Sequence, residues 1–297
     1  MSHFLSIAAI ALFCAIPQSP RRASPYVGAI SADASTGRVL FQANADAAAY
    51  PASVTKLMTL LLVLEDIEAG KYTLSTRITA GEEPTRLSEE SWVDLRPGES
   101  MTVDDLLSAL MVKSANDAAV ALGINSAGSF DKFVERMNAR AAELGMKDTR
   151  YYNPNGLPPV SKTANGKVRR YPWKAFNVST CADQLKLAME LVKKPQVFKY
   201  TSQKVATVTD GRGQELKFVN HNNLMVKNKQ KILNPDGSEA VDGLKTGYID
   251  AGGSSIVLTG KRGGARAIVV VLGSSNSKER DENAGRLLQD ALDALSW

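Results

Sequence analysis

The stretch SSIVLTGKRGGARAIVVVLG, residues 254–273, decides the fold because it is typical of a β-hairpin. Two apolar runs rich in Val and Ile, which favour strands, flank KRGG, whose glycines are typical of a turn. Further strand signals are FKYTSQKVATVT (198–209) and GLKTGY (243–248). These patterns therefore predict that the C-terminal third of the chain contributes most of the strands of a β-sheet.

The N-terminal part of the chain supplies two more expected strands, in YVGAISADASTGRVLFQANAD (26–46), around a turn at DASTG. Thr102 is the expected N-cap of a helix, with Asp105 three residues on. This order predicts an α/β fold of the α+β kind, with one sheet built from both ends of the chain and a helical subdomain at about 80–175 between them. Helical patterns lie at 51–70, 102–114, 116–123, 129–145, 179–194 and 279–297.

Composition limits the classes of function. The chain has 297 residues, 44% of them hydrophobic, and its net charge of +5 is scattered among acidic residues, so nucleic acid is not an expected partner. The apolar run near the N-terminus suits a secretory signal peptide and is too short to span a bilayer. We expect a signal peptide at 1–23 and a soluble secreted or periplasmic product, 24–297, with no transmembrane anchor.

Cysteine and histidine are scarce. After residue 23 the chain holds only Cys181 and His221. They are too few for an internal disulfide or a Cys/His zinc site, and any Ser-His-Asp triad would have to use His221. No metal and no other cofactor is expected.

A lysine held neutral can replace histidine as the base for a serine nucleophile. PASVTK (51–56) sets Ser53 and Lys56 at positions i and i+3 of a helix start, which share a face. Helix N-terminal N–H groups would also favour negative charge developing there. S-x-x-K alone is weak evidence, since it recurs at Ser129 and Ser275, where an N-cap and a loop explain it.

Two further motifs strengthen the prediction. S-A-N (114–116) lies between two expected helices, and K-T-G (245–247) lies in an expected strand. The order S-x-x-K, S-x-N, K-T-G is the signature of penicillin-recognising serine enzymes. From about Tyr26 to the last helix, the chain resembles the low-molecular-mass penicillin-binding proteins, the D-alanyl-D-alanine carboxypeptidase family of serine-type D,D-peptidases. The blocks that carry the resemblance are YPASVTKLMT, LLSALMVKSANDAAVALG, YYNPNGL and VDGLKTGYIDAGG.

The resemblance implies a β-lactamase/transpeptidase-like fold. This fold has a five-stranded antiparallel sheet flanked by helices, an inserted all-helical subdomain, and the active site in the cleft between them. The implied reaction removes the terminal D-alanine from peptidoglycan stem pentapeptides through an acyl-enzyme. The implied partners are those stem peptides and β-lactam antibiotics, which act as covalent inhibitors.

The resemblance also implies the catalytic residues. Ser53 is the nucleophile and Lys56 the expected base, although Lys245 stays a candidate for that role. The base must lose its proton well below the usual lysine pKa of about 10.4, which burial and a neighbouring cation promote. Ser114 would relay the proton to the leaving amine. The oxyanion hole would use the backbone N–H groups of Ser53 and Tyr248.

Substrate binding is expected at Asn116, which would hold the peptide amide, and at Thr246, which would bind the terminal carboxylate. Gly247 would let the substrate lie against the strand without a Cβ in the way. Arg280 occupies the place of the family's carboxylate-binding arginine; an ion pair with the acidic residues that follow it is the alternative interpretation. His221 is interpreted as a structural or cleft-wall residue.

Three other functions remain open. Only one expected helix follows K-T-G, so no C-terminal β-sandwich domain is expected, and shorter family members include D,D-endopeptidases that act on crosslinks. A class A β-lactamase shares the motifs, but no E-x-x-L-N element lies between Asn116 and Lys245 to supply its glutamate. A non-catalytic β-lactam or peptidoglycan sensor would be expected to carry a signalling module, and none is visible. The basic stretch at 161–176 is interpreted as a surface insertion.

Overall fold

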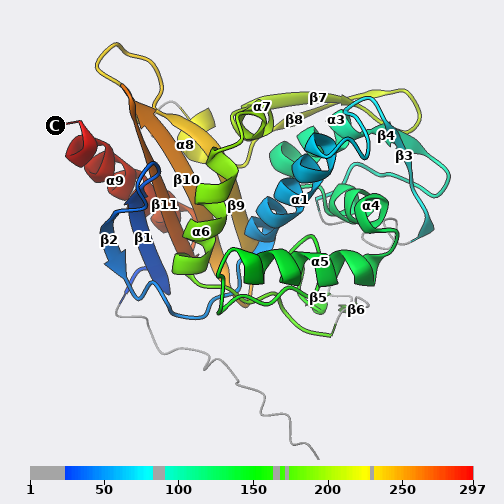
Figure 1. Ribbon diagram of the computed structural model, residues 1–297, viewed down its shortest axis with the longest axis horizontal. Helices are drawn as coiled ribbons and strands as arrows, with labels where there is room; N and C mark the ends of the chain where they lie inside the picture. Colours follow the sequence, from blue (N-terminus) through cyan, green and yellow to red (C-terminus); the bar gives the residue numbers. More distant parts are fainter. Residues whose placement is uncertain (1–23, 83–90, 163–167, 171–173, 228–230, 297) are drawn as a thin grey trace, which may run out of the picture.

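The computed structural model describes residues 24–82, 91–162, 168–170, 174–227 and 231–296, so the expected signal peptide lies outside the described residues. Antiparallel strands form the main sheet in the order β2-β1-β11-β10-β9 (Figure 1). The sheet unites strands from both ends of the chain, as predicted. Its members are β1 (Gly28–Asp33), β2 (Val39–Ala43), β9 (Val241–Ile249), β10 (Gly253–Arg262) and β11 (Ala265–Ser274).

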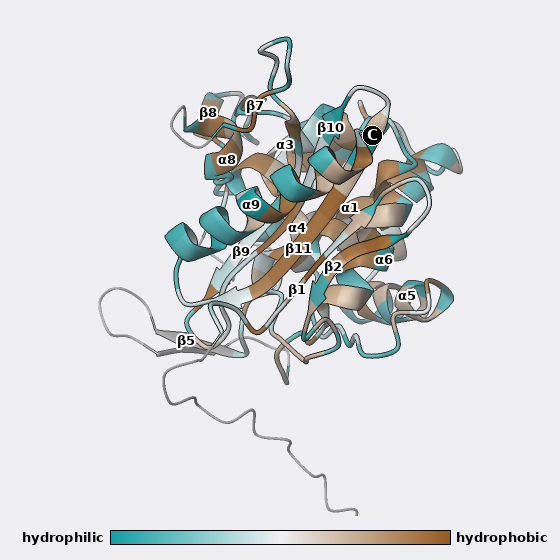
Figure 2. Ribbon diagram, turned by 90° about the vertical axis from the view of Figure 1, so that its left-hand side faces the viewer, coloured by the Kyte–Doolittle hydropathy of each residue, from teal (hydrophilic) through white to brown (hydrophobic). Residues whose placement is uncertain are grey.

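Helices cover both faces of this sheet. α9 (Ser277–Leu295) packs on one face, and α6 (Cys181–Val192) packs on the other together with α1 (Lys56–Glu68) (Figure 1). Val269 and Val271 of β11 belong to the core on the α9 side, whereas Ile268 and Val270 belong to the core on the α1 side. Because both faces are buried, β11 is apolar at consecutive positions. Figure 2 shows these hydrophobic strands and the hydrophilic outer surface of α9.

The remaining elements surround α1. Thr102 caps α3 by accepting a hydrogen bond from the Asp105 N–H at 3.0 Å, as predicted, and Ser129 caps α5 in the same way. The helices are η1 (Ala52–Thr55), α3 (Val103–Ser108), η2 (Ala109–Lys113), α4 (Asn116–Ala127), α5 (Phe130–Glu143), α7 (Gln196–Thr201) and α8 (Asn223–Val226). The short strand pairs are β3 (Arg77–Thr79) with β4 (Ser100–Thr102), β5 (Val160–Lys162) with β6 (Val168–Arg170), and β7 (Val205–Thr209) with β8 (Glu215–Val219).

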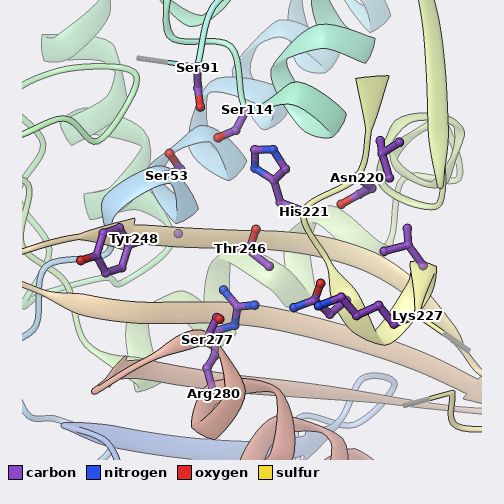
Figure 3. A pocket seen from close by; sticks show the side chains of 14 residues that line it. Ser53, Ser91, Ser114, Asn220, His221, Lys227, Thr246, Tyr248, Ser277 and Arg280 are labelled. Atoms are coloured by element: carbon purple, nitrogen blue, oxygen red, sulfur yellow. The ribbon is translucent and has the colours of Figure 1, made fainter. Parts of the chain in front are cut away.

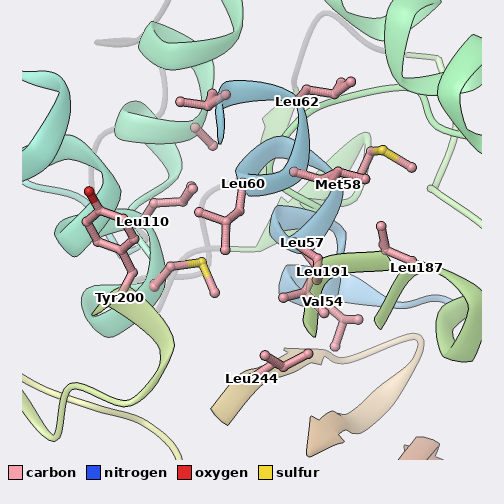
Figure 4. Packing of buried hydrophobic residues seen from close by; sticks show 14 of the residues in the cluster. Val54, Leu57, Met58, Leu60, Leu62, Leu110, Leu187, Leu191, Tyr200 and Leu244 are labelled. Atoms are coloured by element: carbon pink, nitrogen blue, oxygen red, sulfur yellow. The ribbon is translucent and has the colours of Figure 1, made fainter. Parts of the chain in front are cut away.

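α1 is the centre of the larger hydrophobic core (Figure 4). Every residue from Leu57 to Leu64 is buried, so this helix is apolar all round rather than amphipathic. Each fully buried leucine stabilises the fold by about 1.5–3 kcal/mol relative to an exposed one. The core therefore fixes α1, and with it the residues at its N-terminus. No helix in the described part of the chain is long and apolar enough to cross a membrane.

The strand predicted for 198–209 was wrong in its first part. Residues up to Thr201 form helix α7, and the strand β7 begins only at Val205. Pro195 precedes the helix, and Val197 and Tyr200, three positions apart, are both buried, which is a helical spacing. In the basic stretch 161–176, residues 161–162 and 168–170 belong to the antiparallel pair β5 and β6, while 163–167 and 171–173 lie outside the described residues.

Substituting Gly123 tests the contact between α4 and α5. A Cβ at this position would lie 2.6 Å from the ring of Phe133, which is fully buried. Alanine favours a helix over glycine by about 1 kcal/mol, but crowding a packed core costs about 1–3 kcal/mol. We therefore expect Gly123→Ala to lower the free energy of unfolding, measured by urea denaturation.

Gly285→Ala is the matched control for this prediction. Gly285 also lies within a helix, but the nearest atom to its added Cβ would be 3.4 Å away, an ordinary contact. We expect this variant to be as stable as the unmodified protein or more stable. If both alanine variants gained stability equally, the tight contact at Phe133 would be refuted.

Candidate active site

A cavity of about 700 Å³ opens at the junction of η1, β9, α8 and the N-terminus of α9. Figure 3 shows the hydroxyl groups of Ser53, Ser91 and Ser114 directed toward one another on one side of it. Thr246 and Arg280 lie on the other side. The cavity gathers most of the residues predicted from the sequence: Ser53, Ser114, Thr246, Gly247, Tyr248 and Arg280 all line it.

Ser53 and Lys56 are brought together by an unusual helix start. Ala52 has a positive φ of 51°, and η1 is a 3₁₀ turn that leads directly into α1. In a 3₁₀ turn, side chains three positions apart eclipse one another. The Nζ atom of Lys56 accordingly lies 2.9 Å from the Oγ atom of Ser53.

The Lys56 amine is enclosed by protein. Its side chain is fully buried, and its Nζ donates hydrogen bonds to Asn116 Oδ1 at 2.7 Å and to the backbone oxygen of Asn155 at 2.6 Å. Burial lowers the pKa of Lys56 well below its usual value; the positive charge of Lys245 lowers it further, and the carboxylate of Asp117 opposes the change. The site therefore favours a neutral amine beside the serine hydroxyl.

The contact from Asn155 depends on a glycine. Gly156 has φ +86°, and a Cβ there would lie 1.9 Å from the backbone oxygen of Ala52. Only a residue without a Cβ lets this loop approach η1 so closely. Asn153 braces the loop, because its Oδ1 accepts the backbone N–H of Gly156 at 2.6 Å.

The S-A-N motif occupies the junction predicted for it. The turn of π-helix η2 ends at Ser114, which has φ 61°, and α4 begins at Asn116. The left-handed conformation is uncommon for a residue other than glycine and is typical of functional sites. Ser114 Oγ is buried and makes no hydrogen bond to a described residue. The backbone N–H of Asn116 donates to the backbone carbonyl oxygen of Ser91 at 2.7 Å, which ties the motif to the cavity wall.

Asp117, next to the motif, anchors the preceding loop. Its carboxylate accepts the backbone N–H groups of Val93, Leu95 and Ala118 at 2.9–3.2 Å. Burial raises its pKa to about 6, and these hydrogen bonds oppose that rise. Asp117 therefore fixes the loop and also contributes to the electrostatic field at the Lys56 amine.

Lys245 lies on β9, at the edge of the sheet nearest η1. It is only 3% exposed, and its Nζ donates to the backbone oxygen of Thr246 at 3.0 Å. Burial, and secondly the charge of Arg280, lower its pKa to about 7. A Cβ at Gly247 would lie 2.7 Å from Pro51 O and 3.0 Å from Ser53 N. The glycine therefore allows close packing of η1 on β9, a role in addition to the substrate contact expected from the sequence.

Arg280 lies in the first turn of α9 and is 4% exposed. Figure 3 shows its side chain extending from α9 toward Thr246. It also forms an ion pair with Asp281. The ion pair considered as the alternative interpretation is therefore present, and Arg280 also lines the cavity in which it was expected to bind a carboxylate.

His221 is a cavity-wall residue, as interpreted from the sequence. Burial, and next the charge of Lys245, lower its pKa to about 4, so the imidazole is neutral at pH 7. The sequence analysis missed Ser91, Ser277 and the Asn155 carbonyl. A backbone carbonyl has no side-chain signature; the only hint was the turn-forming Asn155-Gly156 dipeptide within YYNPNGL.

Comparison with known proteins supplies the family. The peptidase S11 family, described as D-alanyl-D-alanine carboxypeptidase, matches residues 20–276. The chain is 33% identical over 264 residues to D-alanyl-D-alanine carboxypeptidase DacF of Bacillus subtilis, covering 89% of this chain and 61% of that protein. It is 36% identical over 129 residues to a D-alanyl-D-alanine endopeptidase of Pseudomonas aeruginosa, covering 43% of this chain and 40% of that protein. The chain thus spans less than two thirds of the length of these curated relatives.

Solved structures agree with the family. PBP3 of Streptococcus pneumoniae superposes with a TM-score of 0.76 at 31% identity, covering 92% of this chain and 71% of that one. Penicillin-binding protein D2 of Listeria monocytogenes, in its ampicillin-bound form, gives 0.72 at 30% identity, covering 92% and 99%. The five-stranded antiparallel sheet flanked by helices is therefore the β-lactamase/transpeptidase-like fold that the sequence predicted. The chain belongs to the peptidase S11 family, the D-alanyl-D-alanine carboxypeptidases.

Proposed function

We propose that the protein is a serine D,D-carboxypeptidase that removes the terminal D-alanine from peptidoglycan stem pentapeptides. The observation that carries this proposal is the 2.9 Å contact between Ser53 Oγ and the fully buried Lys56 amine, at the wall of a cavity that also holds Thr246 and Arg280. Membership of the peptidase S11 family supports the same reaction. Since peptidoglycan lies outside the cytoplasmic membrane, the proposed site of action is extracytoplasmic.

Acylation begins with Lys56 as the base. A neutral amine has two N–H donors and one lone pair. The donors are taken by Asn116 Oδ1 and the Asn155 carbonyl, which leaves the lone pair for the Ser53 hydroxyl proton. Ser53 Oγ then attacks the carbonyl carbon of the penultimate D-alanine while its proton passes to Lys56.

The tetrahedral intermediate is stabilised by the backbone N–H groups of Ser53 and Tyr248. Its collapse breaks the peptide bond, and the leaving amine of D-alanine receives a proton through Ser114, which lies between the amine and the two lysines in this scheme. The product is an ester on Ser53, which water hydrolyses to restore the hydroxyl. No cofactor takes part in this scheme.

Recognition rests on the substrate's two polar ends. Thr246 and Arg280 bind its terminal carboxylate, since guanidinium and hydroxyl groups are natural donors to that anion. Asn116 holds the peptide amide. A β-lactam carries a carboxylate and a reactive amide in one ring system, so it acylates Ser53 and blocks the site.

The reaction is tested with defined muropeptides and mass analysis. We expect loss of one alanine from a monomeric pentapeptide, abolished in Ser53→Ala because, among the described residues, Ser53 is the only hydroxyl hydrogen-bonded to the Lys56 amine. Cleavage of crosslinked dimers without alanine loss would show that the protein is an endopeptidase and not a carboxypeptidase. Peptide binding without release of any product would favour the alternative that the protein is a non-catalytic peptidoglycan sensor.

A second experiment separates the protein from a class A β-lactamase. We expect the penicillin adduct on Ser53 to persist for many minutes, because no E-x-x-L-N glutamate follows Asn116 to activate a deacylating water. The mass of the intact protein is followed after mixing with excess benzylpenicillin and then removing it. Recovery of the free mass within seconds, with continued turnover of the drug, would identify a lactamase.

Lys245 should lower the stability of the fold at low pH. Its pKa falls from 10.5 to about 7 in the folded state, so between these values the unfolded chain binds more protons and stability rises with pH. The destabilisation caused by the buried Lys245 ammonium is complete below pH 7, and it disappears above the pKa that Lys245 has in the unfolded chain. We expect Lys245→Met to be more stable than the unmodified protein at pH 6, by the order of a few kcal/mol, with a margin that shrinks toward pH 10.

The margin is measured by urea denaturation at several pH values. Lys261→Met is the control, because Lys261 is exposed and should show no such pH-dependent gain. A Lys245→Met protein that is less stable than the unmodified one at pH 6 would contradict the argument that a buried ammonium is costly there.

A further inference from the structure

Arg280 is held by a buried carboxylate. Its Nε and Nη2 atoms donate hydrogen bonds to Asp281 Oδ1 at 2.8 and 2.6 Å. Asp281 is 1% exposed and Arg280 4% exposed. Ion pairs shielded from water in this way are far less screened than pairs at the surface, so the contact fixes the guanidinium strongly.

The same carboxylate has a second partner across the cavity wall. Asp281 Oδ2 accepts a hydrogen bond from Asn223 Nδ2 at 2.7 Å. Asn223 is the first residue of α8 and lines the cavity. Asp281 therefore joins α9, which carries Arg280, to α8, which forms part of the wall.

An ion pair whose only role is to stabilise the start of α9 does not explain why Asp281 is buried and contacts both Arg280 and Asn223. Neighbouring residues on a helix do not face each other, so Arg280 must fold back toward Asp281 to make both contacts. Glu282 offers the comparison: it is exposed and lies 3.9 Å from Lys278, one turn away. Asp281, unlike Glu282, is buried and bound at both of its oxygens.

The pairing leaves one end of the guanidinium for the cavity. Nε and Nη2 are engaged by Asp281, whereas Nη1 makes no hydrogen bond to any described residue. Figure 3 shows the guanidinium on the Thr246 side of the cavity. An arginine already fixed in this orientation loses little rotamer freedom when an anion binds.

We propose that Asp281 is a positioning residue, which presents Nη1 of Arg280 to the substrate's carboxylate and is itself anchored by Asn223. This inference rests on the proposed function, because it assigns a role within the same binding site. It predicts that Asp281 governs selectivity for ligands that carry a free carboxylate.

The test compares acylation of Ser53 by benzylpenicillin and by its methyl ester, which lacks the negative charge. The second-order acylation rate with each ligand is followed by mass spectrometry of the intact protein, and the acid-to-ester ratio is the readout. Both ligands use the same nucleophile, so loss of folded protein lowers both rates and leaves the ratio unchanged.

We expect Asp281→Asn to lower the ratio by about 10-fold or more, the scale of a lost charge-assisted hydrogen bond. Arg280→Gln should lower it at least as far. Glu282→Gln removes the same charge from the adjacent position and should leave the ratio within about twofold, since an exposed charge is well screened. Asn223→Ala keeps the ion pair but removes the hydrogen bond that anchors Asp281, so we expect a smaller fall in the ratio. This variant replaces Asp281→Asn in the test if Asp281→Asn does not fold.

The outcomes separate the two hypotheses. An unmodified protein that forms no adduct with either ligand would refute the proposed function itself. If adducts form and Arg280→Gln lowers the ratio, but Asp281→Asn or Asn223→Ala keeps the full ratio, the positioning role is overturned. An equal fall in Glu282→Gln and Asp281→Asn would also overturn it, because the effect would then not depend on the contact between Asp281 and Arg280.

Discussion

A lysine amine that is buried and hydrogen-bonded to two carbonyl oxygens is the constraint on which the site depends. Among the residues that the structure describes, Lys56 forms no hydrogen bond with a carboxylate; its amine contacts Ser53, Asn116 and the Asn155 backbone. The carboxylate of Asp117, which opposes the lowering of the Lys56 pKa, accepts hydrogen bonds from backbone N–H groups. Burial therefore decides the charge state of the amine, and the fold must keep water away from it.

The fold meets this requirement by bringing three separate segments against the start of α1. β9 approaches η1 closely because Gly247 has no Cβ, and the 153–157 loop does so because of Gly156. The third segment is the left-handed junction at Ser114. The apolar helix behind Ser53 supplies the stability that offsets two buried lysines. Packing and the proposed catalysis are thus coupled, because the same close contacts that complete the core exclude solvent from the amine.

The sequence predicted the parts of this arrangement that periodicity and motif order encode. The β10–β11 hairpin, the cap at Thr102 and the cavity side chains fall in this class. It could not predict that 198–201 is helical, since FKYT has strand propensity and only tertiary burial of Tyr200 selects the helix. Nor could it predict that the backbone oxygen of Asn155 accepts a hydrogen bond from Lys56, because the position of a backbone carbonyl depends on loop geometry rather than on residue type. The motif also identified Gly247, but it could not show that a Cβ there would meet the backbone of Pro51 and Ser53.

The charges of the site support the proposal that Lys56, rather than Lys245, is the base. Arg280 is one of the causes that lower the pKa of Lys245, and Lys245 in turn lowers the pKa of Lys56. An anion bound at Arg280 would cancel part of the first effect, so Lys245 would gain its proton as the substrate enters. The new positive charge on Lys245 would then press the pKa of Lys56 lower still. In the proposed reaction, carboxylate binding would thus favour the pair Lys245 charged and Lys56 neutral, which supports the proposal that Lys56, in contact with Ser53, accepts the proton.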